Sequence, residues 1–194
     1  MLYLLMAIKK NHDTSSKTWF ITFTCFNWIP LFKITDSYDL VYDWLKIIKE
    51  KYFIETIAFV IMPNHVHLIL HLNNSDNLNK IISNGKRFMA YEITKRLKSQ
   101  NQNDILSILS KACSEVEKSK GQLHKTFEPS FDAKEIIYNN FLLQKLNYIH
   151  NNPVAGKWQL AETFLDYEHS SVCFYEKGLP HQKIELKHYM DLME

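Results

Sequence analysis

The 194-residue sequence has few of the residues that form tight turns and cross-links. Its four glycines and five prolines favour long regular helices and strands over tight turns. Its three cysteines, Cys25, Cys113 and Cys173, are odd in number and include no CxxC pair. This pattern supports neither a zinc ribbon nor a disulfide framework, and it favours a reducing, cytoplasmic setting.

Long uncharged apolar runs are also missing. No stretch reaches the roughly 18 apolar residues that a membrane-spanning helix needs, so we expect no membrane partner. The apolar start, residues 1–8, has no basic segment before it and no small-residue cleavage site, so we expect no signal peptide. A hydrophobic fraction of 46% instead predicts a globular chain long enough to bury a core.

Charge is unevenly distributed along the chain. The formal net charge is only +2, yet residues 80–125 hold ten lysines and arginines against four acidic residues, a local net charge of +6. Such a concentration is typical of a surface that attracts phosphate. A solvated helix face explains it equally well, so both interpretations stay open.

Hydrophobic patterning predicts the order strand, helix, strand, strand, helix, strand, followed by a further helix. The expected strands are 19–26, 53–61 (a central strand buried on both faces), 65–72 and 125–131. The expected helices begin at Thr35 or Asp36, at Asp76, and at Asp132 or Ala133, and the last one ends at Asn151.

This order predicts an α+β fold of the ferredoxin-like type, in which an antiparallel sheet has two helices on one face. The appended helix would then cover the other face. We expect one domain over residues 1–194, with a helical insertion at 99–121 and a C-terminal tail after residue 158.

Two histidines stand two positions apart on the third predicted strand. Because side chains alternate across a strand, His65 and His67 project from one face while Val66 and Leu68 point into a core on the other. Two neutral imidazoles held side by side form half of a divalent-metal site. A chance pair of hydrogen-bonded histidines is the alternative.

The appended helix presents a polar stripe of its own. Lys145, Tyr148 and Asn152 are spaced by three and four residues, so they share one side of a helix. Leu142 and Leu146 form the adjacent stripe, which could pack on the sheet. The phenol and the amide would then be set above the histidine face.

A third candidate feature lies on the helix after the histidines. Arg87, Tyr91, Lys95 and Lys98 form one stripe, and an aromatic ring among cations suits a nucleic-acid strand. The alternative is that Tyr91 packs and the cations are merely solvated.

Two motifs, in this order, resemble those of a known family. Met62-Pro63-Asn64-His65-Val66-His67 and Tyr148-Ile149-His150-Asn151-Asn152-Pro153-Val154 resemble the REP-associated tyrosine transposases, relatives of the single-tyrosine HUH (IS200-like) transposases of insertion sequences. Gly85-Lys86-Arg87-Phe88 and Glu168-His169-Ser170-Ser171 are similar to further landmarks of the family. The resemblance covers roughly residues 19–175.

The resemblance implies a metal-dependent enzyme that cuts and rejoins single-stranded, hairpin-containing DNA. His65, His67 and Asn152 would match its ligands for Mg²⁺ or Mn²⁺, and Tyr148 would match its nucleophile, which forms a 5′-phosphotyrosine link. The candidate DNA-binding residues are Lys86, Arg87, Tyr91, Lys95, Lys98 and Lys145. Relatives act as monomers or as dimers that exchange the tyrosine helix, so homodimer and monomer stay open.

Two other functions are compatible with the same residues. One is a binding module on this fold that recognises a DNA or RNA hairpin without cutting it. The other is a zinc hydrolase, which would require a third histidine, cysteine or carboxylate beside His65. The insertion and the tail exceed what compact family members need, and both could change the choice of DNA.

Overall fold

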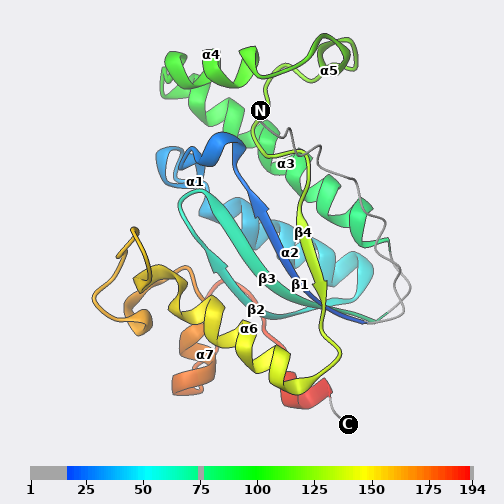
Figure 1. Cartoon of the computed structure of the whole chain (residues 1–194), viewed down its shortest axis with the longest axis vertical. Helices are drawn as coiled ribbons and strands as arrows, with labels where there is room; N and C mark the ends of the chain where they lie inside the picture. The colour runs from blue at the N-terminus through cyan, green and yellow to red at the C-terminus, as the bar shows by residue number, and fades with distance from the viewer. Residues whose placement is uncertain (1–16, 74–76, 193–194) are drawn as a thin grey trace, which may run out of the picture.

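The computed structural model describes residues 17–73 and 77–192. Its centre is a four-stranded antiparallel sheet in the order β2-β3-β1-β4. The strands are β1 (Thr18–Thr24), β2 (Ile54–Ile61), β3 (His65–Leu72) and β4 (Asp132–Glu135). Helices cover both faces, as Figure 1 shows. The predicted ferredoxin-like α+β fold is therefore confirmed.

Two of the three longer helices connect strands, and the third follows the last strand, as predicted. They are α2 (Tyr38–Tyr52), α3 (Leu78–Ser99) and α6 (Asn139–Asn151). Shorter helices are α1 (Leu31–Ile34), α4 (Asn103–Lys111), α5 (Glu115–Ser119) and α7 (Val172–Lys177), with 3-10 turns at Phe26–Trp28, Asn152–Val154, Phe164–Asp166 and Tyr189–Leu192. No helix of the described ranges is long and apolar enough to cross a membrane. Residues 1–8 lie outside those ranges.

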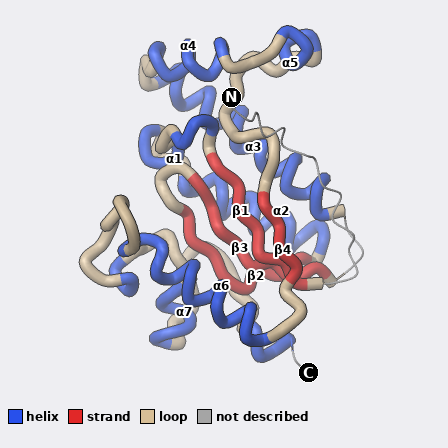
Figure 2. Tube along the Cα trace, viewed as in Figure 1, coloured by secondary structure: helices blue, strands red, loops and turns tan. Residues whose placement is uncertain are grey.

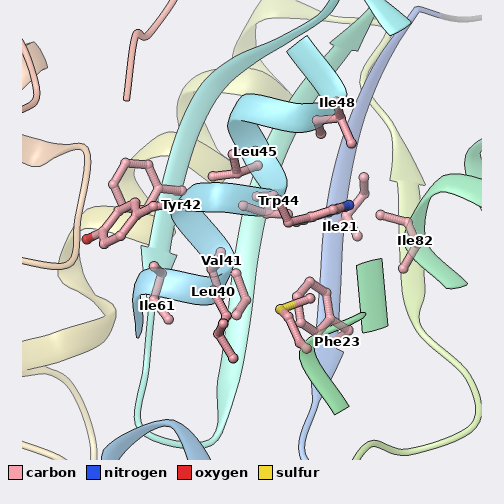
Figure 3. Close-up of a cluster of buried hydrophobic side chains, with 14 of the residues drawn as sticks. Ile21, Phe23, Leu40, Val41, Tyr42, Trp44, Leu45, Ile48, Ile61 and Ile82 are labelled. Carbon is pink, nitrogen blue, oxygen red and sulfur yellow. The ribbon is translucent and has the colours of Figure 1, made fainter. Parts of the chain in front are cut away.

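One face of the sheet forms the main core with α2 and α3 (Figure 3). The even-numbered residues Val66 and Leu68 of β3 are fully buried there, as the alternation predicted. A Cβ added at Gly85 of α3 would lie 2.4 Å from the indole nitrogen of Trp44 on α2. Glycine at this position therefore lets α3 approach the Trp44 ring.

Helix α6 lies over the opposite face of the sheet, as Figure 2 shows, and forms a second buried cluster with it. Leu142, Leu146 and Ile149 of α6 are buried against Phe20 and Ile69 of the sheet. The apolar stripe of this helix thus packs where the sequence placed it. This packing sets the polar stripe of α6 over the histidine face.

The fourth strand and the last long helix begin later than predicted. Residues 125–131 contribute only an isolated bridge, Cys25 to Phe127, and the paired strand is Asp132–Glu135. Pro129 lacks an amide hydrogen, so it interrupts the ladder between these two pairings. Because residues 132–135 are extended, α6 begins only at Asn139, not at 132 or 133.

Strand β2 lies at the edge of the sheet, so the prediction of a central strand is wrong. Its burial has another cause, because the C-terminal tail covers its free edge. The amide of Ile61 donates to the carbonyl of His169, and the Lys187 amide donates to Thr56. The apolar run of β2 is therefore buried by the tail at its edge and by helices on both faces of the sheet.

Helix starts and the insertion also differ in detail. Ser37 is the N-cap of α2, and Asn77 caps α3 by accepting a hydrogen bond from the Lys80 amide, whereas Asp76 lies outside the described residues. The region 99–121 holds two short helices, α4 and α5, where one was expected. They stand beyond one end of the sheet in Figure 1.

Candidate metal and tyrosine site

The two histidines of β3 lie together beneath α6. Their ring centroids are 4.7 Å apart, and both side chains are buried. His71, on the same face at the far end of β3, is bound instead to Thr18, with Oγ1 2.8 Å from its Nδ1. The candidate site therefore contains His65 and His67 alone of these three.

Hydrogen bonds from behind hold each imidazole in place. The Asn64 amide donates to the carbonyl of Trp28 at 2.9 Å, which leaves its Oδ1 to accept from Nδ1 of His65 at 2.7 Å. Thr22, opposite His67 in the β1–β3 pairing, places its Oγ1 2.7 Å from Nδ1 of His67. When Nδ1 carries the proton, the lone pair of Nε2 is available to a metal.

Both histidines are neutral at pH 7. Burial lowers the pKa of His65 to about 4, and a hydrogen bond with the Asn152 side chain opposes this shift only in part. Burial also lowers the pKa of His67 to about 3, helped by the neighbouring His65 ring and by the charge of Lys145. Neutral imidazole is the form that binds metal ions.

Helix α6 brings the tyrosine to this pair within one chain. The Tyr148 hydroxyl lies 3.4 Å from Nε2 of His67, and 47% of the residue is exposed. The Tyr148 ring meets both Phe20 and His67 edge-on. The ammonium of Lys145 lies 4.7 Å from the centre of the Phe20 ring and 5.4 Å from that of Tyr148.

These groups fit a divalent cation. Two neutral imidazoles and the amide oxygen of Asn152 offer three uncharged ligands, to which water and a phosphate oxygen could be added. Within residues 17–73 and 77–192, no three or more His, Cys, Asp or Glu side chains gather into a metal-binding group. The third ligand that a zinc hydrolase would require is thus missing from the described part of the chain.

The predicted DNA-binding residues of α3 fall into two groups. The Lys86 ammonium is turned inward, where it donates to the carbonyls of Glu128 at 2.6 Å and Ser130 at 3.1 Å. It therefore holds the segment before β4 against α3. The other α3 side chains, Arg87, Tyr91, Lys95 and Lys98, are exposed.

A groove of about 750 Å³ runs between α3 and residues 117–129. Arg87, Tyr91 and Lys98 line it from the helix, and Lys120 lines it from the region of the insertion. Neither histidine belongs to it, because α3 and α6 pack on opposite faces of the sheet. The chain thus has a basic groove separate from the histidine and tyrosine residues.

Three residues around the site were missed by sequence reasoning. Thr22 and Asn64 orient the histidines, and Trp28 meets the His65 ring edge-on at 5.8 Å between centroids. Asn64 stands in the recognised motif and could have been noted there. The role of Thr22 depends on strand register, and that of Trp28 depends on a loop conformation.

Fold and site together define a class: a ferredoxin-like protein with a histidine pair beneath a tyrosine-bearing helix. Residues 34–111 match the family model described as "Transposase IS200 like". The resemblance to IS200-like transposases seen in the sequence is therefore confirmed over this part of the chain. No curated protein sequence matches the chain.

One of two similar solved structures supports the same fold. A REP-associated tyrosine transposase bound to a REP hairpin aligns with a TM-score of 0.62 and 17% identity, covering 95% of each chain. A protein of Deinococcus radiodurans R1, provisionally described as a transposase, aligns with a TM-score of 0.42 and 16% identity, over 74% of this chain and 97% of its own.

Proposed function

We propose that the chain cuts and rejoins single-stranded DNA by transesterification, with Tyr148 as the nucleophile. In this proposal His65, His67 and Asn152 hold a divalent metal, Mg²⁺ or Mn²⁺. The main support is the position of Tyr148, whose hydroxyl is 3.4 Å from Nε2 of His67 and accessible from solvent. A phenol beside two neutral imidazoles is suited to attack a metal-bound phosphate.

The reaction exchanges one phosphodiester for another. The Tyr148 oxygen forms a bond to phosphorus and loses its proton, while the bond from phosphorus to the 3′ oxygen breaks and that oxygen gains a proton. The 5′-phosphotyrosine retains the energy of the original bond, so rejoining needs no ATP. A bound divalent cation would polarise the scissile phosphate. Lys145, beside the Tyr148 ring, adds positive charge where the DNA backbone would lie.

We further propose that the site is complete within one chain. The histidines and the tyrosine of the same polypeptide already meet, so no exchange of α6 between copies is required. Mixing His67→Ala protein with Tyr148→Phe protein tests this point. A site shared between copies would restore cutting in the mixture, and we expect no restoration.

The partner we propose is single-stranded DNA next to a hairpin. A hairpin is bound to the REP-associated tyrosine transposase that shares this fold. In the present chain the basic groove offers cations to the phosphates of the DNA backbone. The Tyr91 ring in this groove is 70% exposed and can stack on a base. Arg87, Lys95 and Lys98 complete this binding surface, and Lys86 is left out because its ammonium is already bound.

The test uses a hairpin with a single-stranded tail, a 3′ label and Mn²⁺, resolved on a denaturing gel. Wild type should yield a labelled protein–DNA adduct, because the protein is joined to the 5′ phosphate. Tyr148→Phe should bind the DNA but give no adduct. Tyr138→Phe is the matched control, since this exposed tyrosine precedes the same helix and should leave the adduct unchanged.

An adduct formed by Tyr148→Phe would disprove the choice of nucleophile. Binding without any adduct from wild type, at any tail sequence in a randomised pool, would favour the non-cutting hairpin-binding module instead.

A further inference from the structure

Trp28 is a large apolar side chain left in solvent beside the candidate metal ligands. It is 59% exposed, and its ring centroid lies 5.8 Å from that of His65. An isolated exposed tryptophan needs no explanation, but one that touches a candidate metal ligand at the mouth of a site is a candidate ligand contact.

The backbone holds this indole outward at a cost. Asn27 and Trp28 both have left-handed backbone angles, with φ of 50° and 57°, which are uncommon for residues with bulky side chains. Three hydrogen bonds fix the turn: Trp28 N–H to Cys25, Asn64 to the Trp28 carbonyl, and Asn27 N–H to Glu128. The loop is therefore a rigid support.

Strand register gives the order of groups along the site. Thr22 of β1 pairs with His67, and Thr24 pairs with His65, so the chain passes His67 and then His65 before it reaches Trp28. Tyr148 contacts His67 and, further back along β1, Phe20. Tyr148 and Trp28 thus flank the histidine pair from opposite ends.

In phosphoryl transfer the attacking and leaving oxygens lie roughly in line on opposite sides of phosphorus. With Tyr148 at one end, the nucleotide that carries the leaving 3′ oxygen extends toward the other end. We propose that the Trp28 indole is a stacking site for the base immediately 5′ of the scissile phosphate. The inference rests on the proposed function and adds a nucleobase site to it. Stacking on an aromatic ring tolerates any base, so Trp28 would position the strand.

The experiment first maps the cut made by wild type on the hairpin substrate with Mn²⁺, by sequencing the product that ends in a 3′ hydroxyl. An abasic nucleotide is then placed immediately 5′ or immediately 3′ of that phosphate. Rates of adduct formation at subsaturating DNA are compared for wild type, Trp28→Ala and Trp28→Phe.

The matched control is Phe53→Ala at the opposite end of the sheet. Phe53 is also an exposed aromatic with a left-handed backbone, and its carbonyl also accepts from an asparagine amide, that of Asn73. A loss caused by removing any such aromatic would appear in this variant too.

Trp28→Ala should slow adduct formation about tenfold, and Trp28→Phe should recover most of the rate. The 5′ abasic site should slow wild type by a similar factor, but it should not slow Trp28→Ala any further, because the stacking contact is already lost. The 3′ abasic site removes a different contact. Its effect on the rate should therefore multiply with the effect of Trp28→Ala. The stacking site would be overturned if the effects of the 5′ abasic site and of Trp28→Ala on the rate multiplied, or if Trp28→Ala formed the adduct at the wild-type rate. Either result would leave the proposed function intact. No adduct from wild type would remove both.

A second measurement keeps Trp28 intact and so does not depend on how its variants fold. In Tyr148→Phe protein, 2-aminopurine placed 5′ of the mapped phosphate should lose fluorescence on binding, and the same probe placed 3′ should not. Equal quenching on both sides, or none, would contradict the assignment.

Discussion

Replacing Thr22 with valine tests how the strand register prepares the metal site. Valine keeps the shape of threonine but removes the hydroxyl that lies 2.7 Å from Nδ1 of His67. Without that partner the proton of the neutral ring can move to Nε2, which then loses the lone pair that a metal needs. The change leaves every proposed metal ligand in place.

The size of the effect follows from this single contact. Loss of a hydrogen bond behind a metal-binding histidine typically weakens metal affinity about 10- to 100-fold, or about 1.4–2.8 kcal/mol. The free energy of unfolding should fall by about 1 kcal/mol, since one hydrogen bond to a half-buried hydroxyl is lost. We therefore expect a larger loss of Mn²⁺ binding than of stability.

Titration calorimetry with Mn²⁺ and urea unfolding measure the two effects separately. Thr18→Val is the matched control, because Thr18 makes the same contact to His71, at 2.8 Å, on the same pair of strands. It should lose similar stability and no Mn²⁺ affinity, and Thr22→Ser should restore binding. Wild-type affinity in Thr22→Val, or an equal loss in Thr18→Val, would refute the reasoning.

Three further predictions concern other parts of the molecule. Gly85→Ala should lower the free energy of unfolding by about 1–2 kcal/mol, because its clash with the rigid Trp44 indole outweighs a gain in helix propensity of about 1 kcal/mol. This loss should shrink in a Trp44→Phe background. Urea unfolding of wild type, both single variants and the double variant would show whether it does. Asn64→Ala should weaken Mn²⁺ binding about tenfold in calorimetry, because Asn64 orients His65. Asn73→Ala is the control, since it also removes a hydrogen bond from an asparagine amide to a backbone carbonyl, and it should leave Mn²⁺ binding unchanged. Equal losses in the two variants would argue against a role for Asn64 in orienting His65. Tyr91→Ala should weaken binding of single-stranded DNA about tenfold in fluorescence anisotropy yet leave the adduct rate unchanged at saturating DNA, and a slower rate at saturation would place this ring in the cutting site instead.

The sequence predicted those features that depend on periodicity. Alternation along β3 placed His65 and His67 on one face, and helical spacing placed Tyr148 of α6 on the same side as its C-cap residue, Asn152. Both follow from local geometry, so neither required knowledge of the tertiary structure. The ferredoxin-like order then brought the two patterns to the same side of the sheet.

Features that depend on partners distant in sequence were not predictable in this way. Residues 132–135 form a strand only because β1 offers them a partner, and their own sequence, Asp-Ala-Lys-Glu, has low strand propensity. The run of residues 53–62 suggested a central strand because burial alone does not reveal what covers an edge. The inward turn of Lys86 likewise depends on carbonyls more than 40 residues away.

The tail that hydrogen-bonds to β2 also covers an edge that could otherwise pair with another copy. An uncovered strand of eight mostly apolar residues would present unpaired amides and carbonyls to any other copy, which is a recognised route to aggregation. Residues 167–171 occupy those groups, including the Ile61 carbonyl that the Tyr167 hydroxyl binds at 2.7 Å. Loss of the last 30 residues should therefore lower the solubility of the protein.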